Sequence, residues 1–188
     1  YLNGGHFILA LDDPYIHMTM AKNFVTNGHW ATNNMDFTSA SSSPLWILLI
    51  SGVYLIFGVS VTAPFVLNII SQLASIILTY RILKQFNVSE YLSLILPVFI
   101  LVIPLMPILF TGMEHSAQIF FALLFIMLGS SLISCEVKGS NTALYMVFIT
   151  PVLTGLRYES MFLVFVVSML LLFRKKFFLS LMVLAAGA

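Results

Sequence analysis

Two adjacent aspartates, Asp12 and Asp13, stand in a chain that carries few charged residues. Carboxylates can take a proton from a hydroxyl group as general bases, and their oxygens can hold a hard divalent cation. His17 follows Asp13 by four residues, so on a helix the two side chains lie on the same face. Asp12, Asp13 and His17 therefore suggest a metal site, although a polar surface residue is the simpler interpretation of this histidine.

The other ionisable residues of interest lie far apart in the sequence. Glu114 follows Gly112 at an expected helix start, where a negative charge interacts favourably with the helix dipole. Arg157 and Glu159 lie between two apolar segments, and Arg157 has two candidate partners, Glu159 and Glu114. Lys22 shares the polar segment of the aspartates, and a solvated helix face is its simplest interpretation.

Apolar residues dominate the 188-residue chain: 60% of it is hydrophobic and 8% is charged. Soluble domains usually carry about a quarter charged residues. Apolar runs of about 20 residues recur, as needed for helices that cross a hydrocarbon layer of about 30 Å. The runs are continuous rather than alternating, so the sequence predicts an all-α fold, a polytopic transmembrane helical bundle. The net charge is +1 and no basic stripe exists, so nucleic acid is not an expected partner.

Asp13 and Pro14 predict a helix start, with an aspartate cap and a proline at the first helical position. This helix runs to about Asn27, is too short and too polar to span a membrane, and should lie along its surface. Its expected apolar stripe is Ile16, Met20 and Phe24, which repeat every four residues. The apolar helices expected after the following polar loop are residues 45–57, 63–80, 91–111, 115–135, 143–156, 160–173 and 177 onward.

Basic residues mark the cytoplasmic side of a membrane protein. Here they are Arg81, Lys84, Lys138, Arg174, Lys175 and Lys176. They lie on the side opposite Asp12 and Asp13 if the short segment 45–57 lies along the membrane instead of crossing it. The other side then receives five charged residues from separate parts of the sequence, Asp12, Asp13, Glu114, Arg157 and Glu159. We expect these five to meet in one pocket at the non-cytoplasmic boundary.

This topology divides the chain into two parts. Residues 1–62 form a first extracytoplasmic loop with juxtamembrane helices, and residues 63–188 form the transmembrane bundle. Because the chain starts without an initiator methionine and stops inside an apolar run, we expect it to be a piece of a longer protein that lacks at least one helix at each end.

Four segments occur in an order that resembles the landmarks of a known family. They are DDPYIHMTMAKNFVTNGHW, SSSPLWILLI, GMEHSAQIFFALLF and LTGLRYESMFL. Together they are similar to GT-C-type membrane glycosyltransferases that depend on polyprenyl-phosphate sugars, and most to the bacterial branch with an Asp-Asp motif. Family members often read Thr-Arg-Pro-Glu-Gly in the last segment, where this chain keeps Arg157 and Glu159 but has Tyr158 and Ser160.

The resemblance implies an integral protein of the bacterial inner (cytoplasmic) membrane, with its active site facing the periplasm or the cell exterior. The activity implied is that of a hexosyl- or pentosyltransferase. Such an enzyme moves a sugar from a polyprenyl-phosphate carrier to a glycan, lipid or protein acceptor by inverting displacement. The implied partners are therefore this donor, the acceptor and membrane lipids.

The same resemblance implies that Asp12 or Asp13 is the catalytic base, which takes the proton of the acceptor hydroxyl. Asp12 is the preferred candidate, because Asp13 precedes Pro14 and has a competing role as a helix cap. Whether a divalent metal cofactor is bound stays open.

Arg157 is the implied ligand of the donor phosphate, whose geometry a planar guanidinium matches. Lys22 is a second candidate contact to the phosphate, and Glu114 and Glu159 are supporting acids.

Two alternatives stay open at this point. A transporter would place ionisable groups at the membrane midplane or contain an inverted repeat, and the sequence displays neither. A non-catalytic membrane subunit of a larger complex would keep the same fold without turnover.

Overall fold

The computed structural model describes residues 7–33, 37–38, 41–134 and 140–188, with the backbone alone for residues 99–105 and 140. Within these ranges every regular element is an α-helix, which confirms the all-α prediction. The helices are α1 (Asp13–Asn27), α2 (Pro44–Phe57), α3 (Ala63–Gln85), α4 (Glu90–Leu109), α5 (His115–Ile133), α6 (Ser140–Leu156), α7 (Ser160–Phe173) and α8 (Phe177–Gly187).

The observed helix bounds follow the expected apolar runs closely, and α7 matches residues 160–173 without a shift. The largest difference is at α3, which continues past Tyr80 to Gln85. Arg81 and Lys84 are good helix formers, so the helix extends beyond its apolar run. It ends before Asn87, which adopts a positive φ of 56°.

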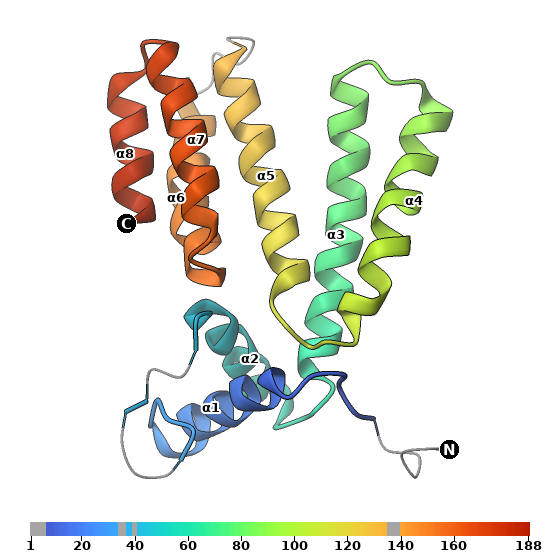
Figure 1. Cartoon of the computed structure of the whole chain (residues 1–188), viewed down its shortest axis with the longest axis vertical. Coiled ribbons are helices and arrows are strands. Elements are labelled where there is room, and N and C mark those ends of the chain that lie inside the picture. Colours follow the sequence, from blue (N-terminus) through green and yellow to red (C-terminus); the bar gives the residue numbers. More distant parts are fainter. Residues whose placement is uncertain (1–6, 34–36, 39–40, 135–139) are drawn as a thin grey trace.

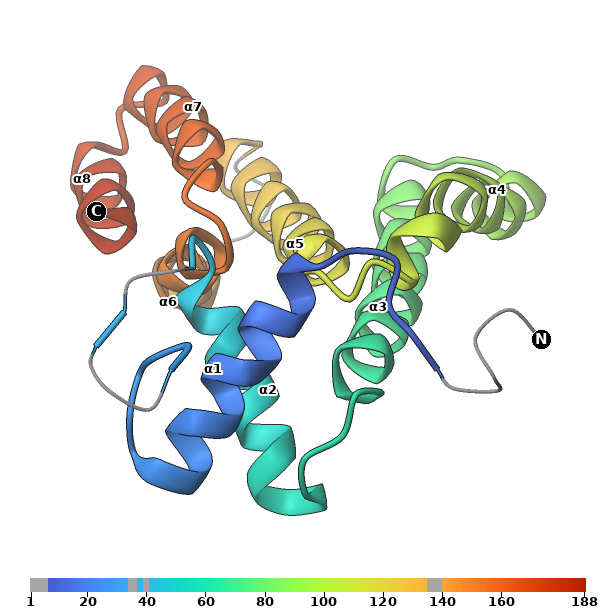
Figure 2. The same cartoon turned by 60° about the horizontal axis from the view of Figure 1, so that its bottom comes forward.

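Helices α3 to α8 run alongside one another, whereas α1 and α2 lie across one end of them (Figure 1). The α4–α5 and α6–α7 connections lie at this end, and Figure 2 shows α1 and α2 packed together beneath them. The α3–α4 and α7–α8 connections lie at the opposite end. Helix α2 does not run alongside the longer helices, and its expected position along a membrane surface stays a prediction.

Most basic residues gather at the end far from α1. Lys84 lies 3.8 Å from Glu90 there, and Lys176 Nζ donates to the carbonyl of Leu132 at 2.6 Å. Arg81, Arg174 and Lys175 belong to the same end, whereas Lys138 falls outside the described residues.

In the described part of the chain, α3 and α5 are long and apolar enough to cross a membrane. The most apolar 18-residue window of α3 is 22% buried, and that of α5 is 28% buried. Shorter apolar helices are α2, α7, α8 and most of α6. Much of the apolar surface of the two long helices thus faces outward rather than into the fold.

Two apolar cores hold the helices together. The first joins α1 and α2 to the bundle; it includes Met20, Trp46 and Ile50, together with Ala117 from α5 and Leu156 from α6. The second lies between α5, α6, α7 and α8; its buried members are Phe125, Leu132, Met146, Leu153, Val164, Val167, Leu171 and Val183. The first core fixes α1 beside the residues that precede α5 and follow α6.

The start of α1 differs from the sequence prediction. The helix begins at Asp13, and Asp12 takes the cap position without a side-chain cap hydrogen bond. The prediction that Asp13 is the helix cap was therefore wrong by one residue. The backbone N–H of Tyr15 instead donates to the carbonyl of Asp12 at 3.0 Å. Asp13 is consequently free of the capping role that made Asp12 the preferred base.

The face of α1 that is buried also differs from the expected apolar stripe. Met20 of this stripe is buried as expected, but Ile16 and Phe24 are exposed, and the polar residues His17 and Asn23 are buried. Asn23 is satisfied because its amide donates to the carbonyl of Ala31 at 2.9 Å, where the chain folds back after the helix. Buried polar groups persist when they find such partners, so the returning loop helps to decide which face of α1 points inward.

Gly112 allows the α4–α5 connection to press against the start of α1. Its φ is +70°, and a Cβ atom there would lie 2.6 Å from Leu9 Cδ1 and 3.0 Å from Pro14 Cβ. Only glycine tolerates both the positive φ and this close approach. Ala10 N–H also donates to the carbonyl of Phe110 at 2.8 Å. These contacts bring the residues before α5 next to the first turn of α1.

Candidate functional site

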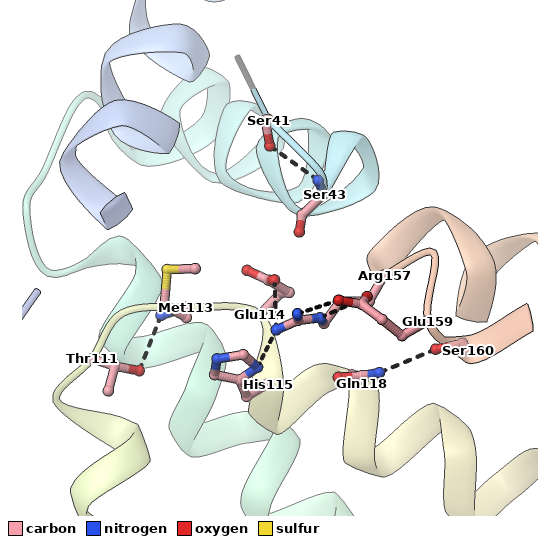
Figure 3. Close-up of polar contacts among 10 residues, drawn as sticks. All are labelled: Ser41, Ser43, Thr111, Met113, Glu114, His115, Gln118, Arg157, Glu159 and Ser160. Carbon is pink, nitrogen blue, oxygen red and sulfur yellow. Dashed lines mark hydrogen bonds and ion pairs between the residues drawn. The ribbon is translucent and has the colours of Figure 1, made fainter. Parts of the chain in front are cut away.

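Arg157 is the centre of a charged group at the end of the bundle where α1 and α2 pack (Figure 3). It follows the last residue of α6, and Glu159 directly precedes α7. Arg157 Nε donates to Glu159 Oε2 at 3.1 Å, and Nη2 donates to Glu159 Oε1 at 2.6 Å. The pair is bidentate, the arrangement in which guanidinium and carboxylate interact with most geometric specificity.

Glu114 approaches Arg157 from the start of α5. Its Oε1 lies 3.6 Å from Arg157 Nη1, its side chain is 1% exposed, and neither carboxylate oxygen has a hydrogen-bond partner in the described part of the chain. Burying a charge without compensation is costly. Arg157 supplies the positive charge that compensates the buried carboxylate of Glu114. The expected position at a helix start is confirmed, because Glu114 takes the cap position of α5.

His115 completes the surroundings of Arg157, with its Nδ1 2.9 Å from Arg157 Nη1. A guanidinium only donates hydrogen bonds, so Nδ1 accepts and the ring carries its proton on Nε2. Sequence reasoning gave this histidine little weight. The signal available was its position beside Glu114 in the first turn of α5.

The contact between Arg157 and Glu159 governs their titration. Hydrogen bonding to Arg157 lowers the pKa of Glu159 to about 2, and the hydrogen bond to Glu159 raises the pKa of Arg157. Both groups therefore stay charged near neutral pH. Arg157 was expected to pair with Glu159 or Glu114, and in the structure it pairs with both.

A cavity of about 140 Å³ lies beside this charged group. Its lining residues are Asp13, Ile16, His17, Ser41, Ser42 and Met113. They come from α1, from the segment before α2 and from the residue before Glu114. Both aspartates are exposed, but Asp13 lines the cavity and Asp12 does not.

His17 is buried beside the cavity, with 4% of the residue exposed and no hydrogen-bond partner for Nδ1. The interpretation of His17 as a surface residue was therefore wrong. Burial lowers the pKa of His17, and the nearby charges of Glu114 and Asp13 oppose this shift without overcoming it. The imidazole is therefore neutral near neutral pH. Its position on the same face as Asp13 is confirmed, since both line the cavity.

The remaining candidates lie away from this centre. Lys22 is exposed, and it lies nine residues beyond Asp13, which is about 14 Å along the helix axis. Among the described residues, no three His, Cys, Asp or Glu side chains are arranged to hold a metal ion. Asp12, Asp13 and His17 therefore do not form the three-ligand metal site that their spacing suggested.

Two side-chain hydrogen bonds between helices hold the site in position. Gln118 Nε2 donates to Ser160 Oγ at 3.1 Å and joins α5 to α7 one turn beyond His115. Gln72 Nε2 donates to Ser116 Oγ at 3.4 Å and joins α3 to α5. These bonds hold the starts of α5 and α7 at a fixed separation, which sets the position of Arg157 relative to Glu114.

No protein-family model, curated protein or solved structure matches this chain significantly. The likeness to GT-C-type glycosyltransferases therefore rests on the four sequence segments. The structure adds that these segments meet in space. Asp13 belongs to the first, Ser42 to the second, Glu114 to the third and Arg157 to the fourth, and all four lie in or beside one polar site.

Proposed function

We propose that this protein is a membrane glycosyltransferase of the GT-C type, which transfers a sugar from a polyprenyl-phosphate carrier to an acceptor hydroxyl. The observation that carries the proposal is the convergence of its four polar segments. Asp13 lines a small polar cavity, and Arg157 pairs with Glu114, which directly follows the cavity-lining Met113. Asp13 and Arg157 are the two groups that this displacement needs.

A bilayer location is supported by the apolar surface of the long helices. Exposed residues such as Ile70 on α3, Ile126 on α5 and Phe162 on α7 would face water in a soluble protein. Extensive apolar surface of this kind marks interaction with a membrane or a partner. The basic residues at the far end favour a cytoplasmic position for that end. The site would then face the periplasm or the cell exterior.

The reaction is a displacement at the anomeric carbon of the donor sugar. The acceptor oxygen forms a bond to this carbon, the bond from the carbon to the phosphate oxygen breaks, and polyprenyl phosphate leaves. Asp13 takes the proton of the acceptor hydroxyl as the new bond forms. Arg157 stabilises the charge that develops on the departing phosphate. Attack from the side opposite the leaving group inverts the anomeric centre.

Asp13 replaces Asp12 as the preferred base in this proposal. Asp13 lines the cavity, whereas Asp12 does not. A general base must come within hydrogen-bond reach of the hydroxyl that it deprotonates. Of the two carboxylates, Asp13 is the one that a ligand in the cavity can approach directly.

The distribution of polar groups favours an enzyme over a transporter. The charged group lies at one end of the described bundle, and the core between α5, α6, α7 and α8 is built from apolar side chains. A transporter needs binding groups near the midplane and a route to both sides. The observed arrangement instead resembles a site that opens at one end.

The test measures turnover of a labelled polyprenyl-phosphate sugar by the full chain in lipid nanodiscs. Two products are measured: sugar transferred to added acceptors, and free sugar released by reaction with water. We expect Asp13→Asn to lower turnover by about 100-fold or more and Asp12→Asn to have a small effect. Glu90→Gln, at the far end, is the matched control. Equal turnover in wild type and Asp13→Asn contradicts the assignment, and no turnover by wild type favours a non-catalytic subunit.

A further inference from the structure

The two edges of the Arg157 guanidinium are held in different ways. The Nε and Nη2 edge is occupied by both carboxylate oxygens of Glu159, at 3.1 Å and 2.6 Å. The Nη1 edge faces His115 Nδ1 at 2.9 Å and Glu114 Oε1 at 3.6 Å. A phosphate that binds the guanidinium through two parallel hydrogen bonds needs the edge that Glu159 now fills.

The two carboxylates differ sharply in how easily they can leave. The Glu159 side chain is 58% exposed, whereas that of Glu114 is 1% exposed. Glu159 can rotate into water and keep its hydration, and exposed ion pairs of this kind contribute little to stability. Glu114 would lose its compensating charge while still enclosed. Displacement by an incoming anion therefore removes Glu159 and leaves Glu114 in place.

We propose that Glu159 is a displaceable counter-ion that occupies the phosphate seat of Arg157, its Nε and Nη2 edge, until a phosphate binds. An incoming phosphate takes the Nε and Nη2 edge of Arg157 and drives Glu159 into solvent. Glu114 and His115 hold the opposite edge throughout, so the guanidinium keeps its position. This inference rests on the proposed function in one respect, which is that the phosphate belongs to the sugar carrier.

Glu159 and the incoming phosphate compete for the same edge of Arg157, and this competition gives Glu159 its role in turnover. A phosphate must interact with Arg157 more strongly than a carboxylate does, so neutral and weakly charged ligands are rejected. After sugar transfer, Glu159 returns to Arg157 as the product phosphate leaves. Because hydrogen bonding lowers the pKa of Glu159 to about 2, the competitor stays charged at any ordinary working pH.

The surroundings of the seat indicate which phosphates to test. Tyr158 lies between Arg157 and Glu159 in the sequence, and it also lines an apolar groove of about 510 Å³ with Met161 and Phe162. A phosphate that carries an apolar chain can place the chain against this groove. Polyprenyl phosphate, an acyl-chain phosphatidate and inorganic phosphate are therefore the three probes, and they separate a carrier lipid, a membrane lipid and a free anion.

The experiment measures the affinity of the full chain in nanodiscs for each probe. We expect Glu159→Gln to bind polyprenyl phosphate about fivefold more tightly than wild type, as removal of an exposed competing pair predicts. Arg157→Gln should bind it about tenfold or more weakly. Glu90→Gln is the matched control, because Glu90 also forms an exposed ion pair, 3.8 Å from Lys84, at the far end. It should not change the affinity.

A double-mutant cycle separates displacement from a general change in surface charge. If Glu159 acts through Arg157, the gain from Glu159→Gln disappears in the Arg157→Gln background. Glu159→Asp, which keeps the charge on a shorter side chain, should lie between wild type and Glu159→Gln and guards against misfolding of one variant. A gain confined to polyprenyl phosphate assigns the seat to the carrier, and an equal gain with inorganic phosphate assigns it to phosphate in general.

Three outcomes overturn the inference, and they are distinguishable. Weaker or unchanged binding by Glu159→Gln, with clear weakening by Arg157→Gln, ends the role of Glu159 but keeps the phosphate role of Arg157. Unchanged binding by Arg157→Gln removes the phosphate role itself, and with it this part of the proposed function. A gain that persists in the double mutant assigns the effect to surface charge.

Discussion

Glu114 Oε1 lies 3.6 Å from Arg157 Nη1, although one residue precedes α5 and the other follows α6. The contact joins the start of α5 to the end of α6, at the end of the bundle where α1 and α2 pack. Glu114 is enclosed and Arg157 is partly open, with 1% and 23% of their side chains exposed. The pair therefore anchors the guanidinium from the protein side and leaves its other edge to the exposed carboxylate of Glu159.

The first prediction concerns the stability of this anchor. Glu114→Gln keeps the side-chain shape but removes the charge that balances Arg157. We expect a loss of about 1–3 kcal/mol in the free energy of unfolding, because a partly buried charge loses its enclosed partner. Glu159→Gln should cost less than about 1 kcal/mol, since that pair is exposed. Denaturant unfolding of both variants checks the order, and a larger loss for Glu159→Gln contradicts it.

The second prediction concerns Gly112, which combines a φ of +70° with a close approach to Leu9 and Pro14. Gly112→Ala should lower the free energy of unfolding by about 2 kcal/mol or more, because strain and overlap act together. Gly28→Ala is the matched control, since Gly28 has a φ of +71° with nothing within 4 Å of an added Cβ. Its loss reports strain alone. Equal losses in the two variants would show that the contact with α1 contributes nothing.

The third prediction is a pH dependence from His17. Burial lowers the pKa of His17 below its ordinary value of 6.5, against the opposing charges of Glu114 and Asp13. The unfolded chain therefore binds more protons than the folded chain just below pH 6.5. The stability that depends on neutral His17 is complete above this pH and is lost as the pH falls toward the folded pKa.

The measurement is the unfolding free energy of the solubilised protein between about pH 7.5 and pH 5. His17→Gln should flatten the decline, and His29→Gln, at an exposed histidine after α1, should leave it unchanged. Glu159 does not interfere, because lowering its pKa from 4.5 to about 2 places its own loss of stability below pH 4.5. An identical decline in wild type and His17→Gln would assign the pH dependence to other groups.

Much of the fold could be predicted because apolar runs are separated by residues that end or start helices. Pro44 and Gly58 bound α2, and Ser160 begins α7 where the charged turn ends. Because consecutive helices run in opposite directions, the connections between them alternate between the two ends of the bundle. For the same reason, the meeting of Glu114 with Arg157 was expected before any contact was known.

The direction in which individual side chains point could not be predicted in the same way. Whether His17 points inward depends on how far α1 rotates against α2. That rotation is set by the close contact at Gly112 and by the loop that satisfies Asn23. Both are interactions between distant parts of the chain, which helical periodicity does not encode. The capping role of Asp13 was wrong for a related reason, since it depended on where the first helical turn begins.

The last prediction tests whether the cavity beside Asp13 is where the acceptor reacts. Ser42 lines the cavity and is exposed, so Ser42→Phe would fill much of the space without entering a core. We expect the free energy of unfolding to change by less than about 0.5 kcal/mol and sugar transfer to fall about tenfold or more, because the acceptor loses its position beside the base. Binding of polyprenyl phosphate should persist, since Arg157 lies outside the lining. Ser134→Phe, at the exposed far end of α5, is the matched control and should transfer sugar at the wild-type rate. If Ser42→Phe transfers sugar as wild type does, the acceptor reacts elsewhere, and Asp13 loses the geometric argument for its role as the base.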